Sequence, residues 1–136
     1  MIIRDATAED HAKLSDLIAE MADYWWGGLP PTLDRVEDVV DAIVYGSGTC
    51  SALVAEADDG ALIAVATYSL LQVAPSKGGT LFMKDLFVSS SARSAGLGTD
   101  MMSALAQKAR ALDCVRFDWT AETSNPRAID LYHRLG

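Results

Sequence analysis

Residues 93–98, with the sequence RSAGLG, have the composition of a loop that binds an anion. The residues before it, 85–88, are typical of the end of a strand. After it, apolar residues recur at helical spacing, namely Met101, Met102, Leu105 and Ala109. Glycine lets a backbone approach a ligand closely, and the unpaired amides and dipole of a helix N-terminus attract negative charge. The pattern therefore predicts an anion site, most naturally for phosphate.

Two other phosphate-binding loops do not match these residues. A dinucleotide-binding loop has a third glycine where this sequence has Met101, and a P-loop contains Gly-Lys followed by Ser or Thr. Neither pattern fits, so the loop has to be interpreted together with a second motif.

That second motif is the sequence NPRAIDLYHRLG at residues 125–136. Asn125 is a good N-cap, Pro126 suits the first helical position, and Gly136 suits the residue just past the end. Tyr132 lies one turn after Ala128, on a face that we expect to point toward the sheet. A tyrosine in that position usually has a hydrogen-bond partner.

Together the two motifs resemble those of the GNAT superfamily of N-acetyltransferases. Arg-x-x-Gly-x-Gly after a strand ending in Asp-Leu-Phe-Val resembles the acetyl-CoA motif, and Asn-x-x-Ala-x-x-x-Tyr resembles the second motif at the expected distance. With the opening residues 3–7, the resemblance covers essentially the whole chain. Within the superfamily the sequence is most similar to the diamine (spermidine/spermine-type) N-acetyltransferases.

The resemblance implies that acetyl-CoA is the co-substrate and that its pantetheine arm inserts beside the central strand. Backbone groups of Leu86, Phe87 and Val88 would pair with this arm, and the Val88 amide would polarise the thioester carbonyl. Asn125 would contact the arm or cap its helix. The pyrophosphate would be held by the loop residues Arg93, Ser94, Ala95, Gly96, Leu97, Gly98 and Thr99, with a charge-assisted contact from Arg93.

The acceptor side is less well defined. The segment 24–31, YWWGGLPP, combines aromatic rings with helix breakers. Its rings could fill a gap between two helices, or Tyr24 and Trp25 could line the acceptor pocket, as the corresponding loop does in the diamine acetyltransferases. Those enzymes have an acidic residue at the position of Trp25, which serves a cation better.

The reaction needs a base, because an alkylamine with a pKa near ~10.4 is only about 0.04% neutral at pH 7. The diamine enzymes have a glutamate at the position of Lys84, so the obvious base is absent. Asp85 remains as the candidate base, and Asp118 and Glu122 are more remote carboxylates that could relay a proton through water. Lys84 could instead favour an anionic acceptor. The resemblance implies that Tyr132 protonates the leaving thiolate.

The expected function is transfer of an acetyl group from acetyl-CoA to a primary amine of a small molecule, with a diamine or polyamine preferred. Two alternatives stay open. One is a non-catalytic CoA-binding regulatory module, and the other is an acetyltransferase that acts on a protein or peptide amine.

The fold that we expect is a single α/β (α+β) domain over residues 1–136 with about four helices. Strands are predicted at 2–4, 51–57, 61–71, 80–88 and 115–120. By resemblance the sheet is mixed, mostly antiparallel, with a V-shaped splay between its parallel strands. The superfamily continues with further strands, so we expect a C-terminal truncation or a different closure of the sheet. An edge left open in this way would favour a homodimer.

Composition excludes several other classes of protein. A net charge of −8 disfavours binding to nucleic acid or to an anionic membrane and favours cationic partners. The longest apolar run is too short to span a bilayer, and we expect no signal peptide, which indicates a cytoplasmic protein. Cys50 and Cys114 have no metal or redox spacing and are predicted to be buried thiols. His11 and His133 are predicted to be surface residues that bind no metal.

Overall fold

The structure is a computed structural model that describes residues 1–26, 33–46, 50–72, 78–93 and 96–119. Five strands form one sheet in the order β1-β2-β3-β4-β5. The strands are β1 (Ile2–Asp5), β2 (Ser51–Glu56), β3 (Leu62–Gln72), β4 (Gly79–Val88) and β5 (Arg116–Trp119). The helices of the described residues are α1 (His11–Trp26), α2 (Leu33–Tyr45) and α3 (Leu97–Ala111), with short 3-10 turns η1 (Ala8–Asp10) and η2 (Ser90–Ala92).

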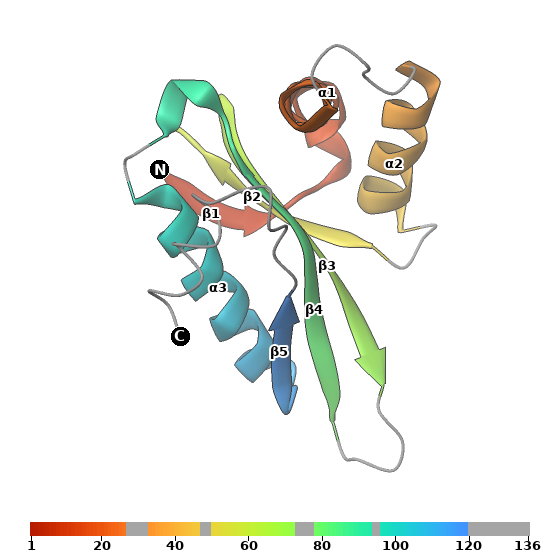
Figure 1. Cartoon of the computed structure of the whole chain (residues 1–136), viewed down its shortest axis with the longest axis vertical. Helices are drawn as coiled ribbons and strands as arrows, with labels where there is room; N and C mark the ends of the chain where they lie inside the picture. The colour runs from red at the N-terminus through yellow and green to blue at the C-terminus, as the bar shows by residue number, and fades with distance from the viewer. Residues whose placement is uncertain (27–32, 47–49, 73–77, 94–95, 120–136) are drawn as a thin grey trace.

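The sheet is antiparallel from β1 to β4, and β5 then pairs in parallel with β4. β5 is short and lies beside the half of β4 that follows the β3–β4 connection, as Figure 1 shows. The mixed sheet with its parallel pair at β4 and β5 confirms the predicted fold class.

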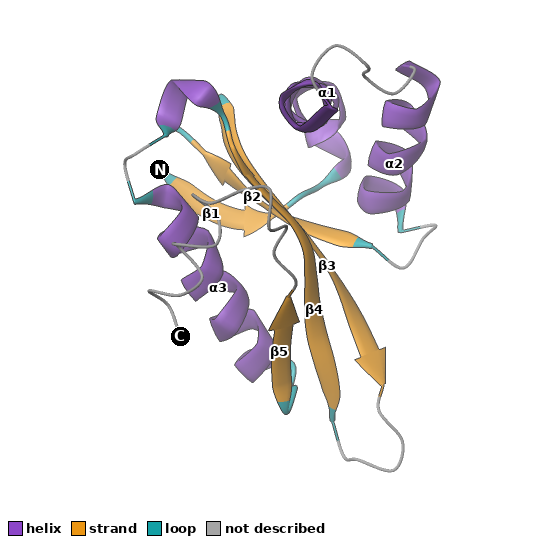
Figure 2. Cartoon of the chain, in the orientation of Figure 1, coloured by secondary structure: helices purple, strands orange, loops and turns teal. Residues whose placement is uncertain are grey.

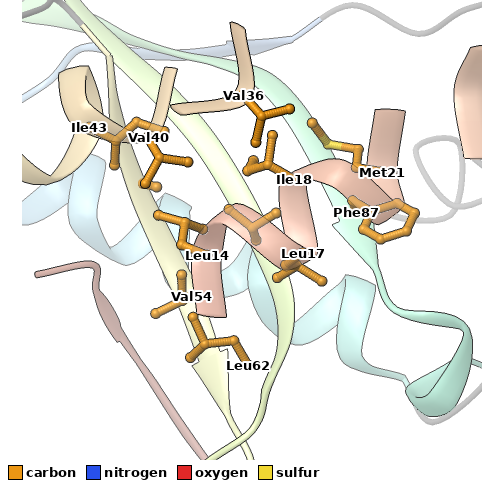
Figure 3. Packing of buried hydrophobic residues seen from close by; sticks show 12 residues of the cluster. Leu14, Leu17, Ile18, Met21, Val36, Val40, Ile43, Val54, Leu62 and Phe87 are labelled. Carbon is orange, nitrogen blue, oxygen red and sulfur yellow. The ribbon is translucent and has the colours of Figure 1, made fainter. Parts of the chain in front are cut away.

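Helices cover both faces of the sheet (Figure 2). One hydrophobic core lies between the sheet and the pair α1 and α2, and it includes Leu14, Val40 and Phe87 (Figure 3). A second core lies between the opposite face and α3, with Met101 and Leu105 fully buried against Leu81. The sheet is therefore buried on both sides, and the two helical layers meet β4 from opposite faces.

A capping box at Thr7 is present at the start of the first helical segment. The Asp10 carboxylate accepts a hydrogen bond of 2.7 Å from the Thr7 amide and two hydrogen bonds from Arg4, each 2.8 Å long. The guanidinium of Arg4 is the main reason why the pKa of Asp10 falls to about 2. This partly buried ion pair joins β1 to the turn that leads into α1.

Most predicted elements are confirmed, with some differences at the level of single residues. On α2, Val36, Val40 and Ile43 form the buried face, whereas Val39 is 46% exposed. Cys50 and Cys114 are only partly buried, since both lie just outside the ends of their strands. The helix predicted between the N-cap Asn125 and Gly136 lies outside the described residues.

None of the described helices has the length and apolar character needed to cross a bilayer.

Candidate active site

A β-bulge interrupts β4 at Lys84. Met83 pairs with Tyr68 and Asp85 pairs with Thr67, so Lys84 is an extra residue without a partner on β3. An extra residue of this kind reverses the alternation of side chains beyond it. Before the bulge Met83 faces α3, and after it Phe87 faces α1. Asp85, two residues before Phe87, therefore faces the side covered by α1 and α2.

The bulge also decides where the backbone of β4 points. The Ser89 amide donates to the Ile63 carbonyl at 2.9 Å, and backbone groups alternate in direction along an antiparallel strand. Phe87 therefore points its amide and carbonyl toward β3. Leu86 and Val88 point theirs toward the opposite edge, on which β5 lies, and the described part of β5 reaches only Met83.

The Asp85 carboxylate is held by Thr67, whose side chain is 2% exposed. The Thr67 hydroxyl accepts the Asp85 amide at 3.1 Å and donates to Asp85 Oδ2 at 2.7 Å. Because the hydroxyl has one hydrogen, accepting the amide directs that hydrogen to the carboxylate. The contact fixes one carboxylate oxygen and orients the other.

Cys50 lies next to this pair. Burial is the main cause that raises the pKa of the Cys50 thiol, and the negative charge of Asp85 raises it further. Cys50 is therefore a neutral thiol at physiological pH and is a poor candidate for a nucleophile.

The connection from β4 to α3 has the geometry of a helix N-terminus open to a ligand. Gly96 is the N-cap residue, with a left-handed conformation at φ 76° and ψ 9°. The first helical bond runs from the Asp100 amide to the Gly96 carbonyl, at 3.1 Å. The amides of Leu97, Gly98 and Thr99 precede that bond, and among the described residues no side chain is recorded as capping this end of the helix.

The same connection is held against α1 by two side chains. Glu20 accepts the Ser89 hydroxyl at 2.9 Å and the Ser90 amide at 3.0 Å. Tyr24 packs against Phe87, and the guanidinium carbon of Arg93 lies 4.2 Å from the centre of the Tyr24 ring. Arg93 also donates from Nε to the Val88 carbonyl at 3.1 Å. The structure thus brings Tyr24, predicted for the acceptor, into contact with Arg93, predicted for the coenzyme.

The other predicted site residues are more dispersed. Lys84 is exposed at the bulge. Asp118 lies opposite Phe82 and forms an ion pair with Arg116 at 3.0 Å. Trp25 is 37% exposed near the end of α1. Ser94, Ala95, Glu122, Asn125 and Tyr132 lie outside the described residues.

A shallow groove lies away from Asp85, between α1 and the β2–β3 turn. Its volume is about 270 Å³, and its lining residues are Lys13, Asp16, Leu17, Glu20, Ala61 and Leu62. Lys13 donates to the Gly60 carbonyl at 2.6 Å, so its charge is already engaged. Within the described ranges, no three or more His, Cys, Asp or Glu side chains are grouped as a metal site would require.

The sequence matches the acetyltransferase (GNAT) family over residues 15–136. This chain belongs to the GNAT acetyltransferase family. Members of this family use acetyl-CoA, which agrees with the helix N-terminus at Leu97 to Thr99 and with the edge of β4 at Leu86 and Val88, which the described part of β5 does not pair with.

Solved structures support the family assignment at the level of the fold. An integron cassette protein from the mobile metagenome of V. cholerae has 31% identity and a TM-score of 0.84, with 99% of this chain and 83% of that chain covered. A ribosomal-protein-alanine N-acetyltransferase from Brucella melitensis has 18% identity and a TM-score of 0.80, with 100% and 91% covered.

A third structure holds a ligand that combines both substrates. It is AAC(6')-Iy in complex with the bisubstrate analogue CoA-S-monomethyl-acetylneamine, with 20% identity, a TM-score of 0.78, and 99% and 88% covered. No curated protein sequence matched significantly.

Sequence reasoning missed two residues that organise the site, Thr67 and Glu20. Thr67 is a threonine in a strand, where that residue type is common, and Glu20 is a carboxylate on a helix, where most are solvated. Neither is part of a motif. Only the pairing of β3 with β4, and the contact of α1 with the end of β4, reveal their roles.

We predict that Gly96→Ala impairs coenzyme binding in addition to stability. The substitution introduces alanine, which disfavours the left-handed conformation that this position requires, at a cost of about 1 kcal/mol. No atom lies within 4 Å of the added Cβ, so strain alone acts on the fold. Gly46→Ala is a matched control, because Gly46 also has a positive φ, 68°, and open space around its Cβ.

Thermal unfolding and acetyl-CoA titration of both variants test this prediction. Both should lose similar stability, and only Gly96→Ala should bind acetyl-CoA more weakly. Equal affinities in the two variants would remove the loop at Gly96 from the coenzyme site.

Proposed function

We propose that this enzyme transfers an acetyl group from acetyl-CoA to a primary amine of a small cationic molecule, with a diamine or polyamine as the preferred class. The proposal depends chiefly on one observation. A carboxylate fixed by Thr67 follows the bulge of β4, next to backbone groups of Leu86 that face an edge not paired with the described part of β5.

The coenzyme would bind along that edge. Leu86 and Val88 point their amides and carbonyls toward it, so they are the proposed partners of the pantetheine arm. Phe87 points its backbone toward β3 and would contribute its ring to the core instead. The pyrophosphate would lie at the N-terminus of α3, where it would accept hydrogen bonds from the amides of residues 97–99, and Arg93 would add a positive charge.

The charge of the helices favours a cationic acceptor. The two helices on the Asp85 side, α1 and α2, together carry seven carboxylates and only two basic residues, Lys13 and Arg35. On the opposite face α3 carries one carboxylate and two basic residues. The layer on the Asp85 side would therefore attract a cation, whereas α3 carries no such excess of negative charge to oppose the coenzyme phosphates.

In the proposed reaction the neutral amine attacks the thioester carbonyl carbon and the C–S bond breaks. The Val88 amide would donate to the carbonyl oxygen as negative charge develops there. Asp85 would accept the amine proton, directly or through water, and Tyr132 would donate a proton to the leaving thiolate, as the second motif implies. Lys84 is exposed beside Asp85, and Asp118 is paired with Arg116. Both side chains would contact the bound acceptor at the edge of the site.

Release of CoA from acetyl-CoA, measured against a panel of amines, tests the proposed acceptor class. The panel contains diamines, polyamines, aminoglycosides, amino acids and lysine peptides at equal concentration. We expect the highest kcat/KM with a diamine or polyamine. A preference for peptides would move the acceptor class to a protein amine, and no turnover with any amine, with acetyl-CoA bound, would favour a CoA-binding regulatory module.

A second prediction concerns the base. Asp85→Asn should lower kcat by about 100-fold or more, the contribution that general-base catalysis typically makes. Thr67→Val removes the hydroxyl that fixes the carboxylate and should lower kcat about tenfold, whereas Thr67→Ser keeps the hydroxyl and should stay near wild type. All three variants should bind acetyl-CoA normally. Wild-type turnover in Asp85→Asn would exclude Asp85 as the base.

A further inference from the structure

We propose that Tyr24 is a positioning residue of the coenzyme site, where it acts through Arg93, with Glu20 as a second anchor one turn earlier on α1. The inference rests on the proposed function, because it assumes that the connection from β4 to α3 holds the coenzyme pyrophosphate. It gives Tyr24 a role different from the acceptor contact that the sequence predicts.

The first observation concerns the beginning of the connection. Ser89 is 7% exposed, and its hydroxyl donates to both oxygens of Glu20, at 2.9 and 3.1 Å. The Ser90 amide donates to the same carboxylate at 3.0 Å. Hydrogen bonds to a charged acceptor are stronger than neutral ones, so Glu20 fixes where the chain leaves β4.

The second observation concerns Arg93, three residues further on. Its Nε donates to the Val88 carbonyl, and its guanidinium lies over Tyr24 at 4.2 Å and over Phe87 at 5.5 Å. A guanidinium within about 6 Å of an aromatic ring centre is attracted to the ring face. Two rings and one carbonyl therefore restrain a side chain that would otherwise be free to rotate.

The two anchors are four residues apart on α1, so they lie on the same face of the helix. Glu20 binds residues 89 and 90, and Tyr24 contacts residue 93. The helix α1 therefore supports the connection at two points before the chain reaches Gly96. Ordering an arginine costs side-chain entropy, and a restraint already present in the free protein reduces the cost at binding. The contact with Tyr24 would thus increase the affinity for the coenzyme.

A double-mutant cycle tests this inference directly. The variants are Tyr24→Leu, Arg93→Met and the combination, and the measurement is the dissociation constant of CoA by calorimetry with no acceptor present. Tyr24→Leu should weaken binding about threefold to tenfold, in line with a partly exposed cation–π contact. In the Arg93→Met background the same change should have an effect below about twofold.

Two controls separate the contact from a general effect on the fold. Tyr24→Phe keeps the ring and should bind CoA as wild type does. Tyr45→Leu removes another exposed tyrosine, 63% exposed at the end of α2, and should leave the CoA affinity unchanged. Thermal unfolding of each variant confirms that it is folded.

The inference is wrong if Tyr24→Leu binds CoA like the wild type. In that case Tyr24 would belong to the acceptor pocket, and Tyr24→Leu should raise the KM for the acceptor. It is also wrong if the effects of the two substitutions simply add. Failure of the proposed function has a different signature, because the wild-type protein would then not bind CoA at all or would not acetylate any amine in the panel.

Discussion

The β-bulge at Lys84 is the constraint on which the site depends. Without the extra residue, the alternation along β4 would place Asp85 on the face covered by α3. With it, Asp85 meets Thr67 under α1 and α2, and Leu86 and Val88 direct their backbone groups to the edge on which β5 lies. One inserted residue thus arranges both the candidate base and the backbone groups proposed for the coenzyme.

The helix α1 supplies the second requirement, which is a fixed path for the chain beyond β4. Its apolar stripe packs on the sheet through Leu14, Leu17 and Met21, and its adjacent face meets the β4–α3 connection through Glu20 and Tyr24. Because the same helix packs on the sheet and holds this connection, a change in its position would act on both. The proposed acceptor side and the proposed coenzyme side therefore both depend on the position of α1.

Much of this arrangement could be predicted from the sequence. Periodicity predicted α3, because its apolar residues recur at helical spacing, and the apolar runs at 51–57 and 61–71 predicted β2 and β3. The glycine loop predicted the open helix N-terminus, and Gly96 has the positive φ that such a turn requires. The bulge could not be predicted, since residues 83–88, MKDLFV, contain no glycine or proline to mark it. The contacts of Thr67 and Glu20 depend on pairings between distant segments, which no local pattern contains.

The central claim is that the bulge directs the Val88 amide, and not the Phe87 amide, toward the proposed coenzyme edge of β4. Amide hydrogen exchange by NMR, in the presence and absence of acetyl-CoA, tests it at single residues. The Phe87 amide should be protected in both states because it faces β3, whereas the Val88 amide should gain protection when acetyl-CoA binds. If the Val88 amide exchanges at the same rate in both states while acetyl-CoA is bound, the proposed path of the pantetheine arm along β4 is wrong.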